Sequence, residues 1–116
     1  MNLQGLFGKR STTSTPPDHL SAAEAFQRQT SGALLVDVRE REEWDYGHAS
    51  GARHIPLGQL SRHLARFPKD RDLLFICQSG SRSNVAMQLA KRAGLARTLN
   101  VKGGMNAWLR AGLPTE

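Results

Sequence analysis

Cysteine is nearly absent from this sequence: Cys77 is the single one among 116 residues. One thiol excludes an internal disulfide framework and any zinc site built from several cysteines. The four histidines sit in different segments, without ligand-like spacing to Cys77: His19, His48, His54 and His63. The sequence therefore predicts a free thiol, no metal site and no cofactor.

Aromatic residues and long apolar runs are also scarce. Aromatics make up 6% of the chain and leave few rings to stack on bases, while the basic excess, a net charge of +6, is scattered. No stretch approaches the roughly 20 apolar residues of a membrane span, and no signal-peptide core is present at the start. We expect no nucleic acid or membrane partner, and a cytoplasmic protein whose charge attracts small anions or an acidic protein partner.

The remaining composition suits one small domain behind an arm. Residues 1–18 are rich in Ser, Thr, Pro and charge and are predicted to form a flexible N-terminal arm, with one folded domain over 19–116. Helical patterns and apolar runs alternate along that domain. Helices are expected within 20–29, 41–47, 57–67, 83–94 and 105–114, and strands within 33–38, 53–57, 72–77 and 96–104. This alternation predicts an α/β fold with a mostly parallel sheet covered on both faces.

Two of these helices carry more detailed signals. Ser21, with Glu24 three residues later, predicts a capping box at the start of the first helix. The helix over 83–94 is expected to turn four apolar side chains toward the sheet, namely Val85, Ala86, Leu89 and Ala93.

The stretch CQSGSRS, residues 77–83, carries the strongest chemical signal. Cys77 ends a predicted strand, a loop is expected from Cys77 to Arg82, and a helix is expected to open near Ser83. Sites of parallel α/β folds lie beyond the carboxyl ends of the strands. The unpaired N–H groups and positive dipole of a helix start favour a thiolate and bind anions.

Individual loop residues fit that chemistry. Gly80 permits a positive φ that turns backbone N–H groups inward, and Arg82 offers a planar fork for sulfonate, phosphate or carboxylate. The small hydroxyl residues can donate hydrogen bonds or cap the helix: Ser79, Ser81 and Ser83. The loop is thus interpreted as a thiolate nucleophile in an anion cradle. The alternative is a packed cysteine in an ordinary strand-to-helix turn.

Three stretches together resemble the rhodanese family. LLVDVREREEWDYGHASGARHIPL (34–57) is similar to its first signature, CQSGSRS (77–83) to the active-site loop of its single-domain sulfurtransferases, and VKGGMNAWLRAGLP (101–114) to its terminal signature. The resemblance covers about 19–114. It implies a rhodanese-like three-layer α/β/α fold with a five-stranded sheet.

The resemblance also implies a reaction. Cys77 would take a sulfane sulfur as a persulfide from a small anionic donor such as thiosulfate, and hand it to a thiophilic acceptor such as cyanide or a thiol. The backbone from Gln78 to Ser83 would form the cradle. Asp37 and Arg39, at the end of the neighbouring strand, are expected to form an ion pair that supports the loops.

Two positions depart from the two-domain thiosulfate enzymes of the family. Basic residues hold the sulfonate there, whereas Glu43 and Ser79 stand at the matching places here. Thiosulfate is therefore interpreted as a surrogate donor, with a persulfide or a partner protein as the physiological one and Arg82 as partial compensation.

Three other functions stay open on the sequence. Cysteine phosphatases and arsenate reductases resemble the loop but use C-x5-R, whereas Cys77 to Arg82 is C-x4-R, a smaller ring that suits one sulfur atom. A non-catalytic interaction module is disfavoured because inactive rhodanese-like domains typically lack the cysteine. A persulfide relay that docks on a partner protein, with the residue 1–18 arm as a docking feature, shares every site residue with a free sulfurtransferase.

Overall fold

Five parallel strands form the centre of the protein, in a computed structural model that describes residues 18–116. The strands are β2 (His19–Leu20), β3 (Leu34–Asp37), β4 (Arg53–His54), β5 (Leu73–Ile76) and β6 (Thr98–Val101). Their order across the sheet is β2-β6-β5-β3-β4, and every pairing is parallel. All carboxyl ends therefore lie at one edge of the sheet.

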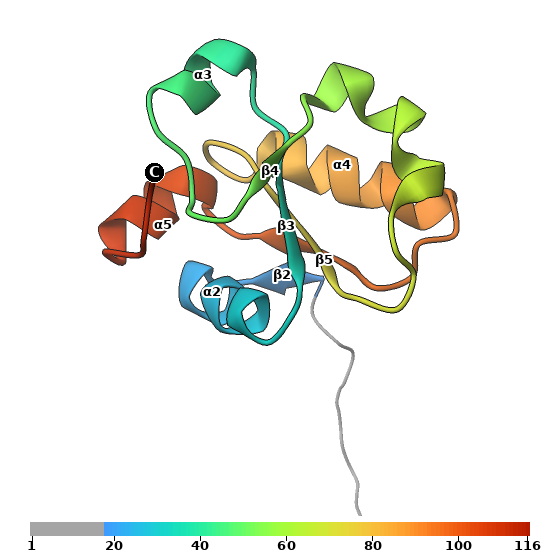
Figure 1. Ribbon diagram of the computed structural model, residues 1–116, viewed down its shortest axis with the longest axis horizontal. Coiled ribbons are helices and arrows are strands. Elements are labelled where there is room, and N and C mark those ends of the chain that lie inside the picture. The colour runs from blue at the N-terminus through green and yellow to red at the C-terminus, as the bar shows by residue number, and fades with distance from the viewer. Residues whose placement is uncertain (1–17) are drawn as a thin grey trace, which may run out of the picture.

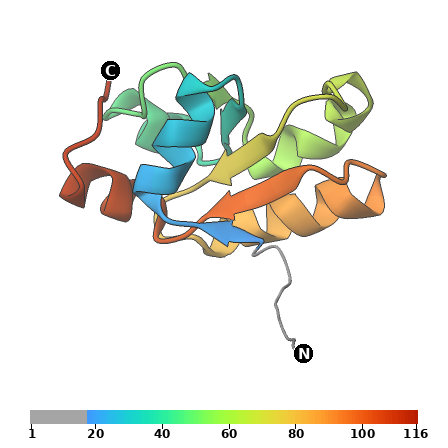
Figure 2. The same cartoon turned by 90° about the horizontal axis from the view of Figure 1, so that it is seen from below.

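Helices cover both faces of this sheet. They are α2 (Ala22–Thr30), α3 (Arg41–Asp45), α4 (Ser81–Arg92) and α5 (Gly104–Arg110), with two 3₁₀ helices, η1 (Leu57–Arg62) and η2 (Leu64–Arg66). Figure 1 shows α2 and α5 on one side of the sheet and α4 with the 3₁₀ helices on the other, and Figure 2 shows the same layers from below. The predicted three-layer α/β/α, five-stranded fold is confirmed.

Each face of the sheet buries its own apolar cluster. One cluster lies under α4, η1 and η2 and includes Val36, Phe75, Met87 and Leu60; the other lies under α2 and α5 and includes Leu35, Ile76, Trp108 and Ala25. Both faces of β3 and β5 are covered, which is why these two strands are continuous apolar runs in the sequence.

The first helix has the predicted start. The Ser21 side chain accepts from the backbone N–H of Glu24, and the Glu24 side chain accepts from the N–H of Ser21. This reciprocal pair satisfies two backbone donors that the helix itself leaves free. It also stabilises the turn that leads from β2 into α2.

Three local predictions are wrong. The pattern over 57–67 forms two 3₁₀ helices rather than an α-helix, since Leu57 and Leu60 lie three residues apart and Gly58 weakens an α-helix between them. The edge strand β2 was missed because it is two residues long. Helix α4 begins at Ser81, two residues before the predicted start.

The inward face of α4 also differs from the prediction. Val85 is 49% exposed and Ala93 is exposed, while Leu89 is partly buried. The buried side chains of this helix are Ser83, Ala86, Met87 and Ala90. Because Ser83 must face the end of the sheet, as shown below, the polar site fixes the rotation of the helix.

The arm predicted over 1–18 lies outside the described residues, apart from Asp18. The backbone carbonyl of Asp18 accepts from the N–H of Asn100, and its carboxylate lies 3.4 Å from Lys91 Nζ. Within residues 18–116, none of the helices has the length and apolar character needed to cross a membrane.

Candidate active site

Cys77 lies directly after β5, at the carboxyl edge of the sheet. Its side chain is fully buried, at 0% exposure. Gly80 has φ 109° and is the N-cap of α4, so the turn from strand to helix is shorter than predicted. An L side chain rarely adopts this backbone conformation, which explains the glycine.

The Cys77 sulfur sits inside the turn and is surrounded by hydrogen-bond donors. The N–H of Gly80 donates to Sγ at 3.1 Å, and the hydroxyl of Ser83 lies 3.2 Å from Sγ. Burial raises the pKa of Cys77, but the Ser83 side chain and the backbone N–H groups of Ser83, Gly80 and Ser79 outweigh it, so that the pKa lies below its ordinary value. The turn therefore favours the thiolate.

The Arg82 side chain makes its hydrogen bonds to a residue outside the loop. Its guanidinium binds the carboxylate of Glu43 on α3 through two hydrogen bonds, Nη1 to Oε1 at 2.7 Å and Nη2 to Oε2 at 2.8 Å. The side-chain hydrogen bond from Arg82 lowers the pKa of Glu43 to about 2. The expectation that Arg82 compensates in part for missing basic residues stays a prediction, with Glu43 bound to the same guanidinium.

Asp37 and Arg39 form the predicted ion pair at the end of β3. The two side chains are 0% and 3% exposed, and both Nε and Nη2 of Arg39 contact the carboxylate, with Nη2 to Oδ2 at 2.9 Å. Arg39 also donates to the Gln78 side chain at 3.0 Å and to the Gly47 carbonyl at 2.8 Å. The pair is thus joined to the Cys77 loop through Gln78, and no hydrogen bond links it to the sulfur.

Gln78 has a supporting position too. Its Oε1 accepts from Arg39, and its Nε2 donates to Asn106 Oδ1 at 2.7 Å. The side chain therefore links β3 to α5 instead of facing the sulfur. Ser79 and Ser81 are exposed, and Ser83 is the one loop hydroxyl that the structure brings to Cys77.

The start of α5 holds the other side of the loop, a contact that the sequence reasoning missed. The N–H of Met105 donates to the Cys77 carbonyl at 2.8 Å, and the N–H of Asn106 donates to the Gln78 carbonyl at 3.1 Å. A Cβ on Gly104 would lie 2.7 Å from the carbonyl carbon of Gln78 and would overlap the Cys77 carbonyl oxygen. The double glycine at the start of α5, Gly103 as N-cap and Gly104 as first residue, was the sequence signal for this close approach.

Two other missed residues are polar and lie behind the loop, Asn100 buried and His19 exposed. Asn100 on β6 is 4% exposed and contacts Ser83, and His19 on β2 contacts Asn100. Nothing in the spacing of these residues relates them to Cys77. They meet because the parallel register places His19 beside Asn100.

Fold and site together define a class: a parallel α/β domain with a buried cysteine in a helix-capping turn at the carboxyl edge of its sheet. Residues 21–111 match the rhodanese-like domain family. The chain belongs to that family.

Named relatives agree with this assignment. The chain is 39% identical over 85 residues to a sulfurtransferase of Allochromatium vinosum, covering 73% of this chain and 79% of that protein. It is 31% identical over 104 residues to the putative sulfur carrier protein YrkF of Bacillus subtilis, covering 90% and 56% of the two chains. The crystal structure of a rhodanese-related protein from Thermoplasma volcanium superposes with a TM-score of 0.77 at 26% identity, covering 84% and 96%.

Proposed function

We propose that this protein is a sulfurtransferase that carries a sulfane sulfur on Cys77. The observation that carries the proposal is the sulfur's position, 3.1 Å from the Gly80 N–H and within reach of the Ser83 hydroxyl. Donors placed in this way stabilise an anionic sulfur before any substrate arrives. They suit a thiolate nucleophile and, after transfer, a persulfide anion.

The transfer takes two displacement steps. The Cys77 thiolate attacks the outer sulfur of a donor such as thiosulfate, a new S–S bond forms, and sulfite leaves with the electron pair of the bond that breaks. An acceptor such as cyanide or a thiolate then attacks the outer sulfur of the persulfide, and the Cys77 thiolate leaves with its electron pair. The lowered pKa of Cys77 favours the anionic attacking group, so the mechanism assigns no side chain as a general base.

The charges around the turn bear on the donor. Thiosulfate is a dianion, and the Arg82 guanidinium beside the turn is already bound to Glu43. The turn then offers neutral N–H groups rather than a free cation to the sulfonate end. We therefore propose a low-molecular-weight or protein persulfide as the physiological donor, with thiosulfate as a slower substitute.

A relay between proteins uses the same site. The relative named a putative sulfur carrier gives this alternative its support. In both versions the free thiol suits a reducing compartment, and we propose the cytoplasm as the place of action.

Intact mass spectrometry tests the proposal directly. The wild-type protein and Cys77→Ser are mixed separately with excess thiosulfate and with glutathione persulfide. We expect the wild type to gain one sulfur atom, faster from the persulfide, and to lose it on addition of cyanide, while Cys77→Ser gains none. No gain from either donor would refute sulfur transfer through Cys77, and an equal gain in Cys77→Ser would place the sulfur elsewhere.

A further inference from the structure

Four polar groups form a continuous hydrogen-bonded row that leads away from the Cys77 sulfur. Cys77 Sγ lies 3.2 Å from Ser83 Oγ, Ser83 Oγ lies 2.5 Å from Asn100 Oδ1, and Asn100 Nδ2 lies 3.1 Å from His19 Nδ1. Cys77, Ser83 and Asn100 are all buried, so water does not replace these bonds. Nothing in sulfur transfer by the turn itself requires Asn100.

The partners of Asn100 fix which way its amide points. Its Nδ2 lies 3.3 Å from the Gly80 carbonyl, which can only accept a hydrogen bond, so the nitrogen must face that carbonyl. The oxygen of the amide is then the atom that faces Ser83. Since Oδ1 only accepts, the Ser83 hydroxyl donates its proton to Asn100.

A hydroxyl has one proton, and two acceptors compete for it here. While Ser83 donates to Asn100, its oxygen is free to accept from the Cys77 thiol, and the row is satisfied with a protonated sulfur. A thiolate or a persulfide has no proton to give and needs a donor instead. The Ser83 hydroxyl must then rotate toward the sulfur and leave Asn100.

We propose that Asn100 is a positioning residue that holds the Ser83 proton away from Cys77 in the thiol state and releases it when the sulfur becomes an anion. The Asn100 side chain makes no hydrogen bond to the sulfur, and the proposed effect runs through Ser83, apart from the support that Asn100 gives to the Gly80 carbonyl. The persulfide half of this inference rests on the proposed function. The thiol half does not, and it is the half that the experiment measures.

Other charged groups near the turn bear on the thiol equilibrium from the elements packed around it. They are Arg82 on α4 with Glu43 on α3, the Asp37 and Arg39 pair at the end of β3, and His19 on β2. The first two pairs are each internally neutral. The Nδ1 atom of the His19 ring lies 3.1 Å from Asn100 Nδ2. Replacing Asn100 with an uncharged residue leaves all these charges in place.

The test is the pH dependence of Cys77 alkylation by iodoacetamide, which reports the thiolate fraction without any sulfur donor. Asn100→Leu removes the competing acceptor, so that Ser83 donates to the sulfur throughout. We expect the midpoint of the alkylation curve of Asn100→Leu to fall by about one pH unit relative to the wild type. Ser83→Ala should raise the midpoint, and Asn100→Leu should have no further effect on the Ser83→Ala background.

If Asn100 only supported the structure of the turn, Asn100→Leu would shift the midpoint of the alkylation curve in the opposite direction. Loss of its bond to the Gly80 carbonyl would loosen the turn, withdraw N–H donors from the sulfur and raise the midpoint. A raised or unchanged midpoint in Asn100→Leu would overturn the proposal, as would a full shift that persists without the Ser83 hydroxyl. If Asn100→Leu does not fold, Asn100→Ala decides by the same criteria.

Thr98→Val is the matched control. Thr98 lies on the same strand, is buried, and its hydroxyl has no hydrogen-bond partner among the described residues. Its near-isosteric substitution perturbs β6 without touching the row, so the midpoint should stay at the wild-type value. A shift in Thr98→Val as large as that in Asn100→Leu would show a general effect of the strand and overturn the proposal.

Discussion

The guanidinium of Arg82 and the carboxylate of Glu43 face each other in a two-armed ion pair, with bonds of 2.7 and 2.8 Å, beside the turn that holds Cys77. The pair joins α4 to α3, across 39 residues of sequence. It pairs the one positive charge of the loop sequence, which would otherwise be free to bind a substrate anion. The net charge of +6 therefore does not describe the entrance of the site.

Glu43→Gln should make thiosulfate a better donor. The substitution keeps the shape of the side chain and leaves the Arg82 charge unneutralised, so that it attracts the sulfonate. We expect kcat/KM for thiosulfate to rise roughly threefold to tenfold, mainly through KM, as for an exposed charge at short range. Steady-state thiocyanate formation from thiosulfate and cyanide measures this.

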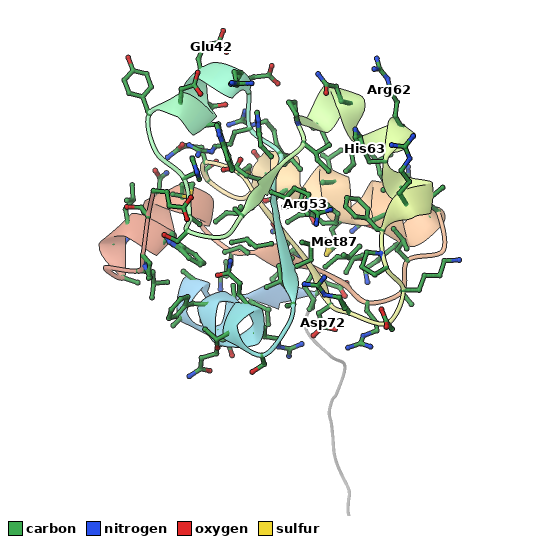
Figure 3. All side chains as sticks on the ribbon, in the orientation of Figure 1. Glu42, Arg53, Arg62, His63, Asp72 and Met87 are labelled. Carbon is green, nitrogen blue, oxygen red and sulfur yellow. The ribbon has the colours of Figure 1, made fainter. Side chains whose placement is uncertain are left out.

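Glu42→Gln provides the control for that change. Glu42 is an exposed neighbour on α3, and Figure 3 shows its side chain on the outer surface. Its substitution by Gln changes the net charge by the same amount as Glu43→Gln. Thiosulfate kinetics should stay within about twofold of the wild type. An equal rise in both variants would mean that net charge rather than the freed Arg82 is responsible.

The ion pair also gives stability a defined pH dependence. Since the pKa of Glu43 is lowered from 4.5 to about 2, its pairing stabilises the fold fully above pH 4.5 and the contribution is lost as pH falls toward 2. Wild type should melt at a higher temperature than Glu43→Gln at pH 7, and the difference should shrink between pH 4.5 and 2. A difference that is constant over this range would contradict the shifted pKa.

Arg39→Ala should strongly destabilise the protein. Asp37 is completely buried, and without Arg39 its charge has no guanidinium beside it, while Gln78 and the Gly47 carbonyl lose a donor. Breaking one side of a buried pair costs about 3 to 5 kcal/mol. Urea unfolding followed by circular dichroism measures the loss.

Arg41→Ala removes a comparable pair on the surface. Arg41 binds Asp45 at 3.2 Å within one turn of α3, and both side chains are mostly exposed. Such pairs contribute about 0.3 to 0.5 kcal/mol. A cost for Arg39→Ala no larger than the cost for Arg41→Ala would show that the Asp37 pair is not a support of the loop.

Gly104→Ala should deform the site because the new methyl group would overlap the Cys77 carbonyl oxygen. We expect a drop in stability well above the about 1 to 2 kcal/mol that a positive φ alone costs, together with loss of sulfur loading. Gly112→Ala is the control: Gly112 also has a positive φ, 69°, but open space for a Cβ, so it should cost about 1 to 2 kcal/mol from the backbone alone and leave loading intact. Equal effects of the two substitutions would refute the close approach at Gly104.

The sequence predicted the parts of the fold that depend on local pattern. The apolar runs of β3 and β5, the capping box at Ser21 and the glycine turn at Gly80 each follow from a few neighbouring residues. The position of Cys77 at a strand end follows from the same pattern. The short strand β2 carries too few residues for any pattern to mark it.

The missed features depend on residues that meet only in space. Arg82 was interpreted from its own chemistry, and nothing near it in the sequence identifies Glu43 as its partner. The sequence predicts Asn100 only as a residue of a strand. Its contact with Ser83 depends on the register in which β6 pairs with β5. The rotation of α4 was wrong for the same reason, since a buried polar residue, Ser83, sets it instead of Val85.

The complete burial of the Cys77 side chain has a consequence for oxidative damage. A thiolate is ordinarily open to peroxide, which converts it in steps to sulfenic, sulfinic and irreversibly to sulfonic acid. Because Sγ takes up a sulfur atom in the proposed reaction, the turn around Gly80 and Ser83 must open to admit a donor, and peroxide can use the same opening. Oxidation of Cys77 should therefore follow how often the turn opens, as sulfur loading does, and both reactions should be slower than those of a fully exposed cysteine.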